Sequence, residues 1–279
     1  MQLADGSFPW FPGGYSNTFI TMYIMTGYGR LRNLGVEIDL LTALRCADFM
    51  DKKIVEFYEN IIKYDKDYKK NNHMDSTIAF YLYGRSFFLK DRPIPTESKV
   101  AVDYFIEQAK KNWLKVGYRM SQAHIALGLQ RFGDKQTPLD IVKSIKERSV
   151  TDDEMGRFWR ENEIGYSWNR ADIETQAMMI EMFSEITKDE EAVEECKVWL
   201  LKQKQTQNWK TTKSTADAIY ALILKGCDLL ASDKIVTVTL DNKEVKPEKV
   251  EAGTGYYQKI YSGAEVKPQM GNIQVKKED

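Results

Sequence analysis

Residues 6–14 read Gly-Ser-Phe-Pro-Trp-Phe-Pro-Gly-Gly, and two later segments are variants of this aromatic turn: Gly-Tyr-Ser-Trp at 165–168 and Gln-Asn-Trp at 207–209. Each turn leads into an amphipathic segment that contains a threonine, and these threonines are Thr18, Thr175 and Thr215. A recurring unit of turn and helix predicts helical hairpins that stack as repeats. We therefore expect a scaffold built from similar parts.

Apolar residues recur at helical spacing over most of the chain. The pattern predicts helices at 17–34, 37–63, 75–90, 97–115, 119–132, 136–148, 171–187, 189–204 and 212–231. The polar run Asp51-Lys-Lys predicts an interruption or bend in the second of these, and residues 149–170 read as a loop or irregular hairpin. Paired helices joined by short loops predict a mainly α fold.

The pattern changes near Lys234, where Ile235-Val-Thr-Val-Thr-Leu alternates apolar and polar residues as a strand does. We predict two parts: a helical part at 1–233 and a small β lobe at 234–279. The apolar content of the lobe is thin for an independent fold, so we interpret it as a truncated part of a neighbouring module.

Composition excludes several classes of protein. The 279 residues are 43% hydrophobic and carry 40 basic and 41 acidic side chains, a net charge of −1. This balance argues against a nucleic-acid or anionic-membrane binder. No apolar run is long enough to span a membrane. The N-terminus opens directly into the first aromatic turn with no leader pattern, so we expect the chain to be a piece of a longer protein.

No pattern in the sequence predicts a catalytic residue, a metal site or a cofactor. The two histidines, His73 and His124, are far apart, and zinc-site, nucleophile-elbow and phosphate-loop motifs are absent. The three cysteines, Cys46, Cys196 and Cys227, lie singly in apolar helical segments. We interpret them as small core or near-surface residues.

A glycosidase is the enzyme hypothesis that the sequence leaves open, since it needs two carboxylates beside a cleft. Asp172 and Glu174 follow Trp168 closely, and an acidic run occupies 152–154. Acids in the first turn of a helix are explained more simply as helix-end groups. The aromatic turns are open to two readings as well. Their rings, Trp10, Phe11, Trp168 and Trp209, line a ligand cavity in one reading and wedge neighbouring hairpins in the other.

The first block, residues 5–14 and the helix at 20–36, resembles the bacterial alpha-2-macroglobulin family, especially its Bacteroidetes-type members. The softer matches are at 164–168, 173–177, 207–221 and 251–256. The similar region in that family is the helical toroid that corresponds to the thioester domain, together with the β segment after it. The resemblance implies an α/α toroid here, and the predicted helices are too few for a complete one. We therefore expect an incomplete helical barrel that lacks upstream helices.

The family resemblance implies a non-catalytic part of a broad-spectrum endopeptidase inhibitor that traps proteases, exported to the periplasm or cell surface. Its implied partners are target proteases, met by the full-length protein, and neighbouring domains of the same chain. Members with a thioester carry Cys-x-Glu-Gln, and no cysteine here is followed by that pattern, so no thioester is expected in this chain. The alternatives are a polysaccharide-active toroid enzyme and a protein- or ligand-binding helical repeat module.

Overall fold

The computed structural model describes residues 1–160, 171–206, 209, 211–224, 237–241, 243–246, 249–250 and 257–276. The chain divides into two compact units, Met1–Leu224 and Lys225–Asp279. The predicted boundary after residue 233 lies within 225–236, which the structure does not describe. The two units are therefore considered separately.

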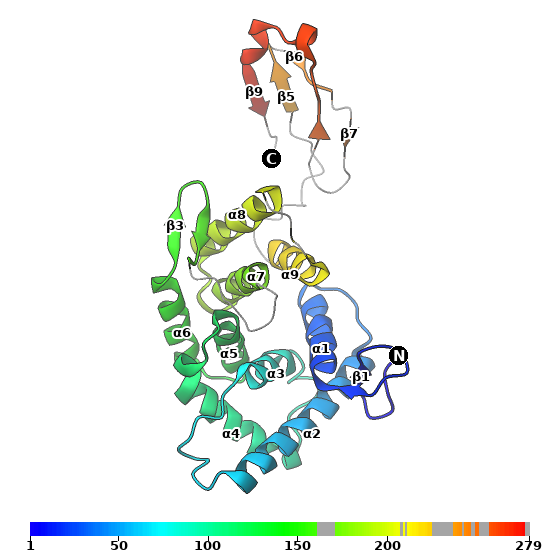
Figure 1. The fold of residues 1–279 in the computed structure, drawn as a ribbon, viewed down its shortest axis with the longest axis vertical. Coiled ribbons are helices and arrows are strands. Elements are labelled where there is room, and N and C mark those ends of the chain that lie inside the picture. The colour runs from blue at the N-terminus through cyan, green and yellow to red at the C-terminus, as the bar shows by residue number, and fades with distance from the viewer. Residues whose placement is uncertain are drawn as a thin grey trace. The chain divides into compact units, whose positions relative to one another are not determined.

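Helices of the first unit alternate between an inner and an outer layer (Figure 1). The inner helices are α1 (Thr18–Asn33), α3 (Ser76–Ser86), α5 (Arg119–Arg131), α7 (Asp172–Met182) and α9 (Thr212–Ile223). The outer helices are α2 (Leu40–Tyr64), α4 (Thr96–Asn112), α6 (Gln136–Glu147) and α8 (Glu190–Thr206). Along the inner layer α1 packs on α3, α3 on α5, α5 on α7 and α7 on α9. The predicted mainly α fold is confirmed.

Side-chain caps start several of these helices. The side chains of Asn17, Asp39, Asp75 and Thr211 accept hydrogen bonds from backbone N–H groups in the first turns of α1, α2, α3 and α9. Such caps satisfy donors that have no partner within the helix. Gly35, with φ +81°, follows the end of α1, as expected for a glycine stop.

The predicted interruption at Asp51-Lys-Lys is wrong. Helix α2 runs without a break from Leu40 to Tyr64. Asp51 is 1% exposed, and its carboxylate pairs with the guanidinium of Arg85 on α3. A polar residue on the buried face thus holds two helices together instead of ending one of them.

Other predicted boundaries change as well. Helix α3 ends at Ser86, not at 90, and α2 begins at Leu40, not at 37. Helix α9 ends at Ile223, not at 231, because Leu224 is extended (ψ 120°). The region at 149–170 begins with an antiparallel hairpin of β3 (Val150–Asp152) and β4 (Gly156–Phe158). Residues 161–170, with Tyr166 and Trp168, lie outside the described residues.

A single apolar core extends through the first unit between the two layers of helices. Its largest fully buried apolar side chains are Tyr81, Tyr83, Phe88, Phe105, Phe183, Met22, Met25, Met50, Ile54, Leu82 and Ile125. Six of these side chains come from inner helices and the others from outer helices or from residues just after an inner helix, so both layers build the core.

The second unit contains short strands. Strand β5 (Thr237–Leu240) pairs with β6 (Lys243–Glu244) and with β9 (Ile273–Lys276), both antiparallel. A separate pair joins β7 (Lys249–Val250) and β8 (Tyr257–Gln258). The predicted small β part is confirmed.

Candidate functional site

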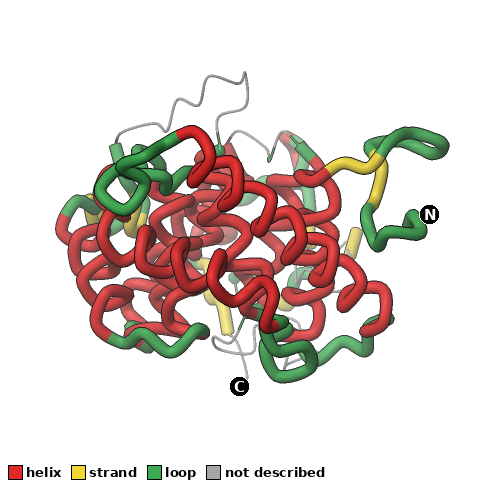
Figure 2. Tube along the Cα trace, turned by 90° about the horizontal axis from the view of Figure 1, so that it is seen from below, coloured by secondary structure: helices red, strands yellow, loops and turns green. Residues whose placement is uncertain are grey.

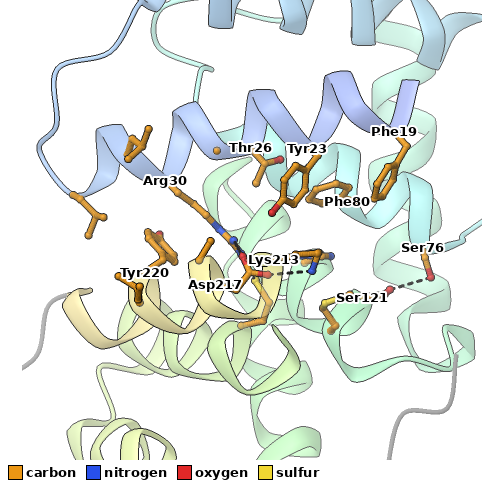
Figure 3. A pocket seen from close by; sticks show the side chains of 18 of the residues that line it. Phe19, Tyr23, Thr26, Arg30, Ser76, Phe80, Ser121, Lys213, Asp217 and Tyr220 are labelled. Carbon is orange, nitrogen blue, oxygen red and sulfur yellow. Dashed lines mark hydrogen bonds and ion pairs between the residues drawn. The ribbon is translucent and has the colours of Figure 1, made fainter. Parts of the chain in front are cut away.

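An apolar cavity of about 510 Å³ lies at the centre of the first unit, on the side where α1 faces α9 (Figure 3). Both of these helices line it along most of their length, and α3, α5 and α7 contribute to its floor. Aromatic and aliphatic side chains dominate the lining: Phe19, Tyr23, Leu31, Phe80, Met120, Met178, Ile219, Tyr220 and Ile223. A cavity of this size and character can hold an apolar ligand or an apolar segment of a protein.

The five inner helices run parallel. Ser121 donates to Ser76 between the first turns of α5 and α3, whereas Tyr83 and Arg131 meet near the ends of the same two helices. Between α1 and α9, Arg30 pairs with Asp217, and Asn33 donates to Tyr220 one turn further on. The C-terminal ends of the inner helices therefore gather at one end of the barrel, where their dipoles favour cations such as Arg30 and Arg131.

A buried network of charges occupies that end. Glu181 on α7 is 0% exposed and accepts hydrogen bonds from the Tyr83 hydroxyl at 2.6 Å and from Arg131 Nη2 at 2.8 Å. Arg30 Nε donates to the Tyr83 hydroxyl at 3.0 Å and lies 4.0 Å from the Glu181 carboxylate. Burial raises the pKa of Tyr83 well above its usual value, so its hydroxyl stays a donor. The positive charges of Arg30 and Arg131, on either side of Glu181, compensate the negative charge of its carboxylate.

The carboxylates considered for a glycosidase do not line the cavity as a free pair. Glu174 is buried at 5% exposure, and its carboxylate lies 3.4 Å from Lys213 Nζ. Asp172 occupies the first turn of α7, as a helix-end acid does. The acid that does line the cavity is Asp217, which pairs with Arg30 and, at 3.1 Å, with Lys213 (Figure 3). The acidic run at 152–154 lies in and next to the β3–β4 hairpin and is exposed.

His124 is the one titratable cavity residue that the sequence singled out. Its ring stacks on Tyr83 at 4.8 Å between centroids and lies 5.1 Å from the ring of Phe80. Burial lowers the pKa of His124 well below its usual value, helped by the charges of Arg30 and Lys213. The imidazole is therefore neutral near pH 7 and packs as part of the floor.

The aromatic turns differ in where the structure places them. Trp209 is 8% exposed, and its indole N–H donates to the carbonyl of Leu200 on α8 at 3.2 Å, as a wedge between hairpins would. Trp10 and Phe11 are instead 65% and 64% exposed, so the wedge interpretation is wrong for them within this chain. Trp168 lies outside the described residues.

Exposure of the first turn follows from how its hairpin is anchored. Strands β1 (Phe8–Pro9) and β2 (Ser16–Asn17) pair with each other beside the start of α1, and Phe8 N–H donates to Thr21 at 2.8 Å. The turn between them extends beyond the helices (Figure 2). Trp10 and Phe11 are not among the residues that line the central cavity.

Substitution should distinguish the buried Trp209 from the exposed Trp10. Trp209→Phe is expected to lower the free energy of unfolding by about 1–2 kcal/mol, because the smaller ring leaves a gap and the Leu200 carbonyl loses its donor. Trp10→Ala should change the free energy by less than about 0.5 kcal/mol, as exposed sites usually do. Denaturant titration of both variants checks this, and equal effects would contradict the assignment.

The two cysteines in the described part, Cys46 and Cys196, are free and buried. Cys46 accepts a long contact from Gln2 Nε2 at 3.4 Å, and Cys227 lies outside the described residues. Burial raises the pKa of Cys46 to about 11. A thiol in this environment packs as a small apolar group and reacts slowly.

Alkylation of Cys46 should depend steeply on pH. Because its pKa is about 11, the thiolate fraction rises about tenfold per pH unit between pH 7 and 9. In the unfolded chain the same rise levels off near the usual cysteine pKa of about 8.5. Mass spectrometry of the iodoacetamide-treated protein measures both rates, and alkylation of Cys46 as fast in the folded chain as in the unfolded chain would contradict the burial of this thiol.

The part of the chain that the structure describes contains no group of three or more His, Cys, Asp or Glu side chains placed to hold a metal ion. None of its helices has the length and apolar character to cross a bilayer.

The fold has a known relative. A solved structure of Escherichia coli alpha-2-macroglobulin activated by porcine elastase is similar over 88% of this chain and 20% of that chain, with a TM-score of 0.53 and 13% sequence identity. No family model and no curated protein matches the sequence. The chain thus spans about a fifth of the length of that macroglobulin, and at this identity the likeness shows a shared fold.

Proposed function

We propose that this chain is a non-catalytic part of a macroglobulin-like endopeptidase inhibitor. The observation that carries the proposal is the macroglobulin-like fold, which extends over 88% of the chain. The aromatic-turn block at 5–14 and the helix after it supply a second, independent reason, since they resemble Bacteroidetes-type members of the family. The inhibitor as a whole acts in the periplasm or on the cell surface and traps a protease that attacks it.

In this proposal the helical unit serves as a scaffold, and no catalytic residue is assigned to it. No thioester is assigned either, because no cysteine of this chain is followed by the Cys-x-Glu-Gln pattern. The helices form part of a larger toroid whose further helices come from neighbouring sequence. The β unit belongs to an adjoining module of the same inhibitor.

Protease protection tests the proposal on the full-length protein that contains this chain. Incubation with an endopeptidase such as elastase is followed by activity measurements on a large protein substrate and on a small chromogenic peptide. A trap suppresses cleavage of the large substrate by at least about tenfold and leaves the peptide activity nearly unchanged, because the caged protease keeps its active site. Loss of both activities indicates an active-site inhibitor, and retention of both overturns the proposal.

The cavity favours one alternative, a ligand-binding helical module, because its lining is apolar and its volume is about 510 Å³. A polysaccharide-active enzyme is less well supported, since Asp217 is held by Arg30 and Lys213. Assays of the same protein with a polysaccharide panel distinguish the enzyme from the trap.

A further inference from the structure

We call the junction between α1 and α9 the seam. It differs from the junctions between the other neighbouring inner helices. Neighbouring inner helices pack closely from α1 through α9 in sequence order, but α1 and α9 are not among the closely packed pairs in the described part of the chain. The cavity lies between them. Apolar side chains on both sides of the seam stay about half exposed: Phe19 51%, Leu31 44%, Ile219 49% and Ile223 45%. Apolar burial therefore does not close this junction.

Polar contacts from α1 span the seam instead. The Arg30 guanidinium pairs with Asp217 and lies over the ring of Tyr220 at 4.8 Å (Figure 3). Asn33 Nδ2 donates to the Tyr220 hydroxyl at 3.2 Å. The side chains of Arg30 and Asp217 are only 14% and 7% exposed. An ion pair this sheltered is screened weakly by salt and holds its geometry better than a surface pair.

The two partners of this pair are not equally fixed. Arg30 is also bound by Tyr83 on α3 and approaches Glu181 on α7, so it remains in place without Asp217. Helix α9 also packs on α7, and its Ala218 and Ala221 are fully buried. Loss of the pair therefore frees one edge of α9, while its attachment to α7 remains.

We propose that the Arg30–Asp217 pair is a latch that fixes α9 against α1 and thereby controls access to the central cavity. Helix α9 is the last helix of the first unit, so the latch also sets the position from which the chain leaves that unit. The inference is argued from the seam within this chain and makes no use of the proposed inhibitor role. In this proposal the buried charges at this end of the barrel hold α9 in position as well as stabilise the fold.

Asp217→Asn tests the latch, because asparagine keeps the shape and removes the charge. Asp91→Asn is a matched control. Asp91 pairs with Arg32, which lies two residues after Arg30 on α1, and the Arg32–Asp91 pair is more exposed than the Arg30–Asp217 pair. Hydrogen exchange of the 279-residue chain is followed peptide by peptide. In D217N the amides of 213–223 should exchange about tenfold faster than in the wild type, with α3 and α5 unchanged, since local opening costs less when its closing contact is weakened. D91N should leave α9 at the wild-type rate.

Tyr220→Phe provides a second variant that leaves every charge in place and removes the hydrogen bond from Asn33. It should raise the rate of hydrogen exchange in the same peptides by about threefold. This variant also tests the latch if D217N does not fold. The latch is overturned if exchange in α9 is unchanged in both variants, if D91N accelerates it as much as D217N, or if the acceleration is equal in all inner helices.

Discussion

Asp51→Ala is expected to lower the free energy of unfolding by about 3–5 kcal/mol, because it leaves a buried guanidinium without its counter-charge. Arg85 is 0% exposed, and its Nε and Nη2 donate to the two oxygens of Asp51 at 2.9 and 3.1 Å. Tyr81 donates to the same carboxylate at 2.7 Å. The substitution therefore strands two buried donors at once. Chemical denaturation followed by circular dichroism measures the change.

Asp48→Ala is the matched control on the same helix. The Asp48 carboxylate lies 3.5 Å from Arg92, and the two side chains are 36% and 42% exposed. A pair in contact with water contributes little, so the cost should stay below about 1 kcal/mol. If D51A and D48A cost the same, the Asp51–Arg85 pair does not hold α2 to α3 in the way described here.

The Asp51–Arg85 pair shows which part of the structure could not be predicted from the sequence. Apolar spacing located the helices because each helix buries one face, and that signal is local. Asp51 broke the local pattern, so a bend was predicted there. Its partner Arg85 lies 34 residues further on, and the two meet only because α2 and α3 both pack on α1. A lone charge on an apolar helical face is the available hint of such a pair, but it does not name the partner.

The candidate site was harder to predict for a similar reason. Arg30 and Asp217 are separated by 187 residues, and neither belongs to a repeated motif. The aromatic turns drew attention because they recur, yet none of their described rings lines the cavity. Asp217 does stand between alanines on the apolar face of its helix, which marks it as unusual. Nothing in the sequence indicates that α1 and α9 face each other.

Glu181→Ala is expected to cost about 3–5 kcal/mol of unfolding free energy, because two arginines then converge at the end of the barrel with too little negative charge between them. Glu181 is fully buried and accepts from both Tyr83 and Arg131. Glu181→Gln keeps one oxygen that can accept one of these bonds but replaces the other with an amide NH2 and removes the charge, so about 1–3 kcal/mol is expected. Denaturant titration of the three proteins gives both differences.

Glu185→Gln tells whether burial is the cause. Glu185 also binds Arg131, with 2.8 Å between Arg131 Nε and its carboxylate, but its side chain is 31% exposed against 1% for Glu181. Water can replace its charge, so the cost should stay below about 1 kcal/mol. Because Glu181 and Glu185 share an arginine, a larger loss for E181Q than for E185Q isolates the effect of desolvation. If both variants lose the same free energy of unfolding, the network behaves as a surface cluster of charges and does not hold α5 to α7 and α1.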